Sequence, residues 1–192
     1  MMKTLLTLFV LFFSSSVFAN DIRDFQIEGM SVGDSLLDYF SEEEIINSKR
    51  NYFQDERQYY VVGIFDNLKT FDVVDVYLKS NDKNYEIKTI SGKLLIEDKY
   101  QCLEKKEKIT KEINILLDNM EVLNEVKNHD YDKSGKSKQY ISQFNFGSML
   151  THIRVECTIF SKKIKKDLNW EDTLNVVAME EEISNWIFSG YE

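Results

Sequence analysis

The sequence predicts an α+β protein in which two short N-terminal helices precede an antiparallel sheet of about five strands, a three-stranded meander plus a hairpin, packed by a long central helix and a C-terminal helix. Three observations predict this class. Segments rich in β-branched and aromatic residues are joined by short polar connections, as in meanders and hairpins. One long segment between them has helical apolar periodicity. The 192 residues include no proline and only seven glycines, which favours regular elements joined by short loops.

The N-terminal residues have the features of a secretory signal peptide. Lys3 provides a positive start, Leu5 to Phe13 form an apolar run, and Val17-Phe18-Ala19 place small residues at the two cleavage positions. We therefore expect cleavage after Ala19 and a periplasmic or secreted bacterial protein. Retention of the segment as an anchor, and secretion from a eukaryotic cell, are the alternatives.

The expected mature chain, residues 20–192, has the composition of a single folded domain. Asn20 rather than cysteine follows the cleavage site, so we expect no lipid anchor. No later segment is apolar over the ~20 residues that a membrane-spanning helix needs. The chain has 33 acidic and 24 basic residues, and one lysine leaves with the signal segment, so the mature net charge is about −10. This balance argues against nucleic acid and anionic lipid surfaces as partners.

Two capping patterns predict the short N-terminal helices. Ser31 and Asp34 stand three residues apart before an apolar pattern that reaches residue 40, which indicates a first helix capped by Ser31. Ser41 and Glu44 repeat this spacing, so we expect a second helix that runs to about residue 50.

Three β segments are then expected to form an antiparallel meander. They cover residues 58–65, 71–80 and 85–90, and short runs rich in Asp and Asn separate them. In the third segment Tyr85 and Ile87 alternate with charged residues, as when one face of a strand packs and the other is solvated. Residues 93–97 fit either a further strand or a lead into the next helix.

The second half is predicted to contain one long helix, a hairpin and a final helix. Helical apolar spacing extends from Asp98 to about Glu125, and the polar segment 127–138 is the expected linker within the domain. Residues 139–146 and 151–162 flank a Gly-Ser turn as a hairpin. A last helix is expected to start near residue 169 and to stop at Gly190. It would present Val176, Met179, Ile183, Trp186 and Ile187 on one side.

The segment Ile27-Glu28-Gly29-Met30-Ser31-Val32-Gly33-Asp34-Ser35-Leu36-Leu37, followed by two short helices and a meander, resembles the BamE/SmpA and β-lactamase-inhibitor-protein group of small periplasmic domains. The resemblance covers roughly residues 25–96. The chain lacks the lipid-anchored cysteine and the prolines of that group, so the group's assembly function is not expected here. The same segment, together with residues 85–92, Cys102 and the Trp170 to Trp186 region, resembles uncharacterised secreted or periplasmic proteins of marine proteobacterial type. That resemblance implies a location but no activity.

The two cysteines are expected to pair. Cys102 lies on the apolar stripe of the long helix, and Cys157 shares a strand face with Ile153, Val155 and Ile159, so both point toward the core. In an oxidising compartment this favours a disulfide. Two buried free thiols are the alternative, and no Cys-x-x-Cys spacing indicates redox activity.

Ser31 also lies in a Gly-x-Ser-x-Gly pattern, with His129 and His152 downstream as candidate bases. A nucleophile elbow follows several parallel strands, whereas Ser31 lies near the start of the mature chain among antiparallel signals. A small hydrolase using Ser31 is therefore an alternative to the capping role. His152 alternates with Arg154 and Glu156, which we expect on the solvated face of their strand.

Asp130, Asp132, Ser134 and Gly135 occupy positions 1, 3, 5 and 6 of a calcium loop, but Ile141 stands where a bidentate Glu is required. Three nearby lysines oppose a divalent cation. A Ca²⁺-binding module at Asp130 to Gly135 is thus a further alternative to a polar turn. No metal ligands, cofactor site or catalytic residues are assigned.

These observations favour an exported, non-enzymatic protein that binds another macromolecule, most plausibly a protein, through a face or an edge of its sheet. Nothing in the sequence identifies the partner or the oligomeric state. Tyrosine offers broad contacts with a polar end, so one candidate recognition surface consists of Tyr59, Tyr60, Tyr77 and Phe160, although packing within the protein explains these residues as well.

The expected cleavage can be tested directly. When the full-length chain is expressed with an intact secretion system, we expect the exported protein to begin at Asn20, as read by intact mass and N-terminal sequencing. A protein that retains Met1 in the envelope fraction would contradict the signal peptide and favour the uncleaved anchor.

Overall fold

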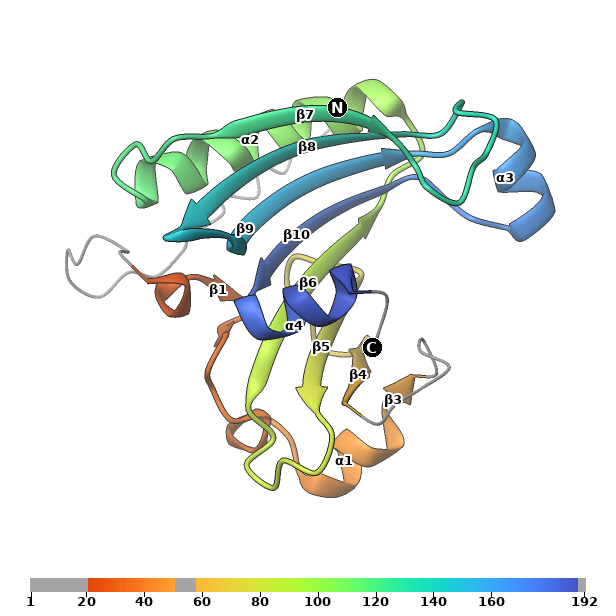
Figure 1. Ribbon diagram of the computed structural model, residues 1–192. Coiled ribbons are helices and arrows are strands. Elements are labelled where there is room, and N and C mark those ends of the chain that lie inside the picture. Colours follow the sequence, from red (N-terminus) through yellow and green to blue (C-terminus); the bar gives the residue numbers. More distant parts are fainter. Residues whose placement is uncertain (1–20, 51–57, 190–192) are drawn as a thin grey trace, which may run out of the picture.

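An eight-stranded antiparallel sheet dominates the structure (Figure 1). The computed structural model describes residues 21–50 and 58–189, and the expected cleavage site at Ala19 lies outside them. The strands are β3 (Lys49–Arg50), β4 (Tyr59–Ile64), β5 (Val73–Lys79), β6 (Ile87–Leu95), β7 (Leu123–Asn128), β8 (Lys138–Phe146), β9 (Ser148–Ile159) and β10 (Thr173–Met179). They lie in the order β3-β4-β5-β6-β10-β9-β8-β7, so the last strand in the chain lies at the centre of the sheet.

The predicted fold class is wrong in the size of the sheet. A sheet of about five strands was expected, whereas the described residues form an eight-stranded sheet and a separate two-stranded one. The meander β4-β5-β6 and the hairpin β8-β9 exist, but three further strands, β3, β7 and β10, lie in segments assigned to helices or a linker. β10 pairs with β6 on one side and β9 on the other, and so joins the meander and the hairpin into one sheet.

The prediction of a first helix capped by Ser31 is also wrong. The chain forms an antiparallel pair, β1 (Gln26–Ile27) and β2 (Met30–Ser31), through a turn in which Glu28 and Gly29 have positive φ angles of 53° and 86°. Ser31 is part of β2, and its backbone N–H donates to Asp34 Oδ2 at 2.8 Å. The hydrogen bond between Ser31 and Asp34 therefore stabilises a turn and not the start of a helix. A single 3₁₀ turn follows at Leu36–Asp38, capped by Ser35.

The second short helix, α1 (Glu42–Asn47), has the predicted capping box. Ser41 Oγ accepts from the N–H of Glu44, and Glu44 Oε2 accepts from the N–H of Ser41. The helix ends at Asn47 instead of residue 50 because the next two residues pair with β4 as strand β3.

The central helix, α2 (Lys99–Leu116), is shorter than expected. Its N-cap is Asp98, which accepts from the N–H of Gln101. Asp118 and Asn119 then adopt left-handed backbone angles, with φ of 50° and 59°, and end the helix. The chain continues as β7, so the linker expected at residues 127–138 begins within a strand.

The expected final helix is wrong over its first half. Helix α3 (Lys162–Leu168) is followed by Asn169, its C-cap, in a left-handed conformation. β10 comes next, and α4 (Glu181–Phe188) begins only after that strand. Val176 and Met179 are therefore on opposite faces of a strand. The residues from 93 to 95, left open in the sequence interpretation, belong to β6.

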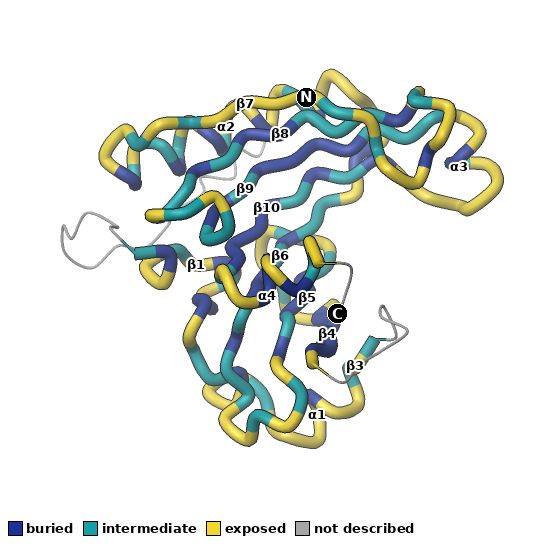
Figure 2. The backbone as a smooth tube through the Cα atoms, viewed as in Figure 1, coloured by how far each residue is buried: buried dark blue, intermediate teal, exposed yellow. Residues whose placement is uncertain are grey.

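The sheet has two faces with different partners. The covered face is apolar and packs against α2, α1 and the N-terminal segment. Its buried strand residues include Tyr60, Val62, Val74, Val76, Ile90, Phe144, Ile153, Val155, Leu174 and Val176. Burial is greatest along the middle strands, while the outer sides of the helices are exposed (Figure 2). We call the opposite side of the sheet the second face.

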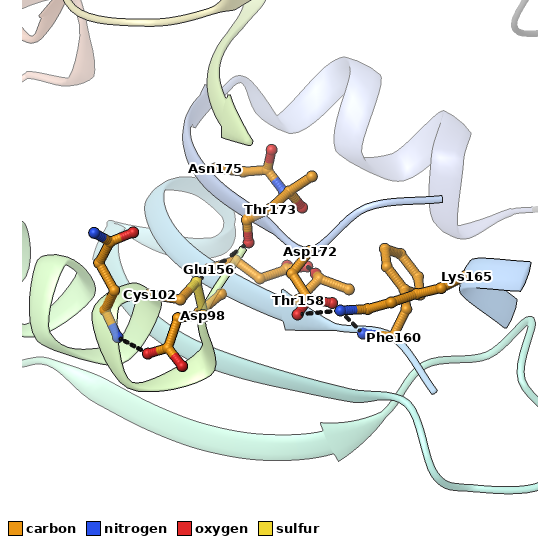
Figure 3. The surroundings of a disulfide bond; sticks show 11 residues. Asp98, Cys102, Glu156, Thr158, Phe160, Lys165, Asp172, Thr173 and Asn175 are labelled. Carbon is orange, nitrogen blue, oxygen red and sulfur yellow. Dashed lines mark hydrogen bonds and ion pairs between the residues drawn. A yellow bond between two sulfur atoms is a disulfide. The ribbon is translucent and has the colours of Figure 1, made fainter. Parts of the chain in front are cut away.

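Cys102 of α2 and Cys157 of β9 lie at disulfide distance and tie the central helix to the covered face (Figure 3). Their Cα atoms are 6.0 Å apart, and both side chains are completely buried. The Cys102 sulfur also contacts the backbone oxygen of Thr173 in β10 at 3.5 Å. The pair therefore holds α2 over the junction between β9 and β10.

Removing this cross-link should destabilise the fold. The two cysteines are 55 residues apart, so the bond closes a long loop in the unfolded chain. Without the bond, the unfolded chain has more conformational entropy. We expect the double variant Cys102→Ala, Cys157→Ala to lose about 2–4 kcal/mol of unfolding free energy in urea denaturation. As a control, a reducing agent should lower the stability of the parent chain but not that of the variant. Equal midpoints for oxidised parent and variant would contradict the cross-link.

Candidate functional site

The second face of the sheet is divided into a covered end and a polar stripe. At one end α4 packs on the face through the cluster Tyr59, Val177, Met179, Ile183 and Trp186. The rest carries the polar stripe, which consists of Gln139, Glu156, Thr158, Asn175, Lys93 and Asp75. The stripe crosses strands β8, β9, β10, β6 and β5. Among the described elements, α4 is the helix that packs on this face, and the core residues it covers lie outside the stripe.

Glu156 is the centre of the stripe. Its Oε1 accepts from Gln139 Nε2 at 2.6 Å and from Thr158 Oγ1 at 2.7 Å, and its Oε2 lies 3.4 Å from Arg154 Nε. Glu156 is 5% exposed although it belongs to the second face. Three neighbours therefore hold a charged group in a fixed position on the sheet surface.

Asn175 continues the stripe toward β6. It lies opposite Glu156 in β9 and opposite Lys93 in β6 (Figure 3 shows it beside Glu156 and Thr173). Its Nδ2 donates to Thr173 Oγ1 at 3.2 Å, but its buried Oδ1 has no hydrogen-bond partner among the described residues. A buried amide oxygen without a partner is costly, so this atom is a preformed acceptor.

Asp75 completes the stripe on β5. The residue is 4% exposed, and its carboxylate lies 3.1 Å from Arg50 Nη1 and 3.6 Å from Lys93 Nζ. The stripe therefore carries charges of both signs, and each charge has a partner. The two carboxylates outnumber the one ammonium within the stripe, and the adjacent Arg50 and Arg154 pair with Asp75 and Glu156.

Helix α4 is held over its end of the face by contacts at both of its termini. Lys79 Nζ lies 2.5 Å from Glu182 Oε1, and Lys88 Nζ lies 3.3 Å from Glu180 Oε2. The rings of Tyr59 and Trp186 lie 4.9 Å apart. The Lys79 ammonium lowers the pKa of Glu182, as expected for an ion pair.

His152 is buried on the second face, which corrects its expected solvated position. It is 2% exposed and lies opposite Met179, which packs against α4. Neither ring nitrogen has a well-aligned hydrogen-bond partner among the described residues. Burial, together with the positive charge of Arg154, lowers the pKa of His152 to about 4, and the backbone of Leu150 and Met149 opposes the shift only in part. The ring is therefore neutral at neutral pH.

The residues considered for a hydrolase do not form a triad in the described part of the structure. Ser31 lies in β2, a short antiparallel strand, and not in a strand-to-helix elbow. His129 packs its ring against Phe160 and Trp170, at 5.1 Å and 5.9 Å between centroids. His152 makes no hydrogen bond to Ser31.

The expected calcium loop is a turn closed by its own hydrogen bonds. Asp132 Oδ1 accepts from the N–H and Oγ of Ser134, and Oδ2 accepts from those of Ser137. These bonds lower the pKa of Asp132 strongly and occupy both of its oxygens. No group of three or more Asp, Glu, His or Cys residues within residues 21–50 and 58–189 has a metal-binding arrangement.

The four aromatic residues proposed as a recognition surface do not share one. Tyr59 and Tyr77 pack with α4 on the second face, Tyr60 lies in the core of the covered face, and Phe160 packs against Trp170 beyond the end of β9. Sequence reasoning instead missed the polar stripe. The alternation of Arg154, Glu156 and Thr158 in β9 was the available signal, but their neighbours in β10 were assigned to a helix.

Comparison with protein-family models, with curated proteins and with solved structures gives no match to this chain. Within the described residues, no helix combines the length and hydrophobicity needed to cross a bilayer. The geometry of the sheet is therefore the basis for a functional proposal.

The buried His152 predicts acid sensitivity. Because its folded-state pKa of about 4 lies below the ordinary value of 6.5, the unfolded chain binds the proton first. The stabilising effect of the neutral ring is complete above pH 6.5 and is lost as the pH falls toward 4. We expect the stability difference between the parent and His152→Gln to change by about 3 kcal/mol between neutral pH and pH 4.

The measurement is urea denaturation across this pH range. His129→Gln is the control, because it leaves His152 in place and should keep the acid-dependent loss of the parent. Identical pH dependence of the parent and His152→Gln would show that the ring is not held neutral by burial.

Proposed function

We propose that this chain is an exported, non-enzymatic protein that binds another macromolecule through the polar stripe on the second face of its sheet. The observation that carries this proposal is the difference between the two faces. One face is apolar and packed against helix α2 and the N-terminal elements. On the other face, outside the cluster packed by α4, the stripe is a row of ordered polar groups. Gln139, Asn175 and Lys93 of the stripe are partly exposed, and the buried Glu156, Thr158 and Asp75 hold Gln139 and Lys93 in place.

The order within the stripe supports a binding role. Free polar side chains on a sheet surface lose conformational entropy when a partner fixes them. Gln139, Glu156 and Thr158 are already joined by short hydrogen bonds, and Lys93 is paired with Asp75. Binding of a partner to these groups therefore costs less conformational entropy.

The dimensions support a macromolecular partner. Neighbouring strands lie about 4.8 Å apart, so a stripe over five strands extends roughly 19 Å across the sheet. Its groups lie in a row along a surface instead of converging on one point. A folded or extended segment of another macromolecule fits this arrangement better than a small molecule does.

Export is supported by two independent features. The cysteine pair at disulfide distance agrees with an oxidising compartment, and the first nineteen residues have signal-peptide composition. The partner would then be a component of the cell envelope or of the surroundings.

The proposal is tested by photo-crosslinking in the cells that produce the protein. A photoreactive amino acid at Gln139 or Gln143, both on β8 and directed to the second face, should give a discrete adduct of higher mass. The same probe at the exposed residues Lys105 or Lys111 of α2 is the matched control. We expect at least several-fold more adduct from the β8 positions. Equal adducts from both faces, or none from β8, would contradict the proposal.

A further inference from the structure

The edge strand β7 has the pattern of a self-pairing surface, and we propose that two copies of this chain associate through antiparallel β7–β7 pairing. β7 pairs with β8 on one side, and no described strand pairs with its other side. It forms the upper rim of the sheet in Figure 1. Such an edge leaves backbone N–H and C=O groups available to a further strand.

The side chains of β7 are accessible for this pairing. Val126 is 61% exposed and Leu123 is 40% exposed, which is unusual for apolar residues of a strand. Glu125 is exposed as well, and neither the Glu125 nor the Lys127 side chain makes a hydrogen bond or an ion pair with another described residue. The strand therefore offers apolar area and two unpaired charges of opposite sign.

The geometry of a continuous sheet limits the register. Two antiparallel copies of one strand are related by a two-fold axis perpendicular to the sheet, so a residue on the second face must lie opposite a residue on the second face. Glu125 and Lys127 belong to that face, opposite Ile141 and Gln139 of β8, and Val126 belongs to the covered face. Along the strand, the axis must therefore lie level with one residue, which then stands opposite its own symmetry mate. An axis level with the midpoint between two residues is excluded.

Charge then selects one register among those allowed. Only an axis at Glu125 or at Val126 lets five residues of β7 pair with their symmetry mates. An axis at Glu125 places two carboxylates opposite each other, which is unfavourable. An axis at Val126 places Glu125 opposite Lys127 of the other copy twice, Asn124 opposite Asn128 twice, and Val126 opposite itself. The strand is self-complementary in this register.

This association would extend the sheet across both copies. Because the axis is perpendicular to the sheet, both polar stripes lie on the same side, and a partner with repeated features meets two stripes at once. The pairing does not require the proposed function. A monomer can still give the β8 photoadduct, so failure of one proposal leaves the other in place.

The test is sedimentation analysis of the mature chain over a wide range of concentration. We expect a reversible dimer that Lys127→Glu weakens on the order of tenfold or more, because two attractive cross-strand pairs become repulsive. The exchange Glu125→Lys with Lys127→Glu restores opposite charges and should restore the dimer. Lys83→Glu, in the distant β5–β6 turn, makes the same charge change and should leave association unchanged.

A cysteine substitution tests the register itself. In a directly opposed pair the Cα atoms lie about 4.5–5.5 Å apart, which permits a disulfide. Val126→Cys should therefore cross-link two copies under oxidising conditions, whereas Asn124→Cys, with its symmetry mate roughly 13 Å away along the strand, should not. A chain that stays monomeric, a Lys127→Glu variant that associates like the parent, or cross-linking at residue 124 instead of 126 would each overturn the proposal.

Discussion

The structure depends on the pairing of β10 with two strands that are distant in the sequence. β6 ends at Leu95 and β9 begins at Ser148, and each would be an edge of a smaller sheet without a strand between them. β10 pairs along its whole length with both, from Thr173 to Met179. The two extended faces of the sheet depend on this junction, because it joins the meander and the hairpin into one sheet.

On one face, the junction gives the core its continuity. Leu174, Val176 and Ala178 of β10 connect the apolar residues of β6 with those of β9. The pair of Cys102 and Cys157 then fixes α2 over the same junction. The hydrophobic effect and the cross-link therefore act at one place in the fold.

On the other face, β10 separates two environments. Val177 and Met179 receive α4, and Asn175 connects Glu156 of β9 with Lys93 of β6 in the polar stripe. A strand only seven residues long thus supplies contacts to the core, to the covering helix and to the candidate binding surface.

The sequence allowed the meander, the β8–β9 hairpin, the start of the central helix and the Ser41 capping box to be predicted, because each depends on local patterns. β10 could not be recognised in this way. Both of its faces are buried, so Val176, Val177 and Met179 do not alternate with polar residues, and Val176, Met179 and Ile183 instead imitate helical spacing. β7 has the opposite difficulty, since an exposed edge strand needs no apolar periodicity.

The candidate site was missed for the same reason. Arg154, Glu156 and Thr158 could be placed on one face of a strand, but their role depends on Asn175 and Lys93, which only the β10 register brings beside them. The Asp118-Asn119 pair, by contrast, was a usable signal for the end of α2 that the helical periodicity around it concealed. Local sequence patterns were enough to predict individual helices and strands, whereas the polar stripe depends on the pairing of strands that are distant in the sequence.

Native-state hydrogen exchange tests the central role of β10 most directly. If β10 joins the two halves of the sheet, the backbone amides of Leu174 to Ala178 should exchange as slowly as the best-protected amides of β6 and β9, and all should open together in global unfolding. Fast exchange in β10 while β6 and β9 stay protected would show two independent sheets, and would contradict this account of the fold and of its polar surface.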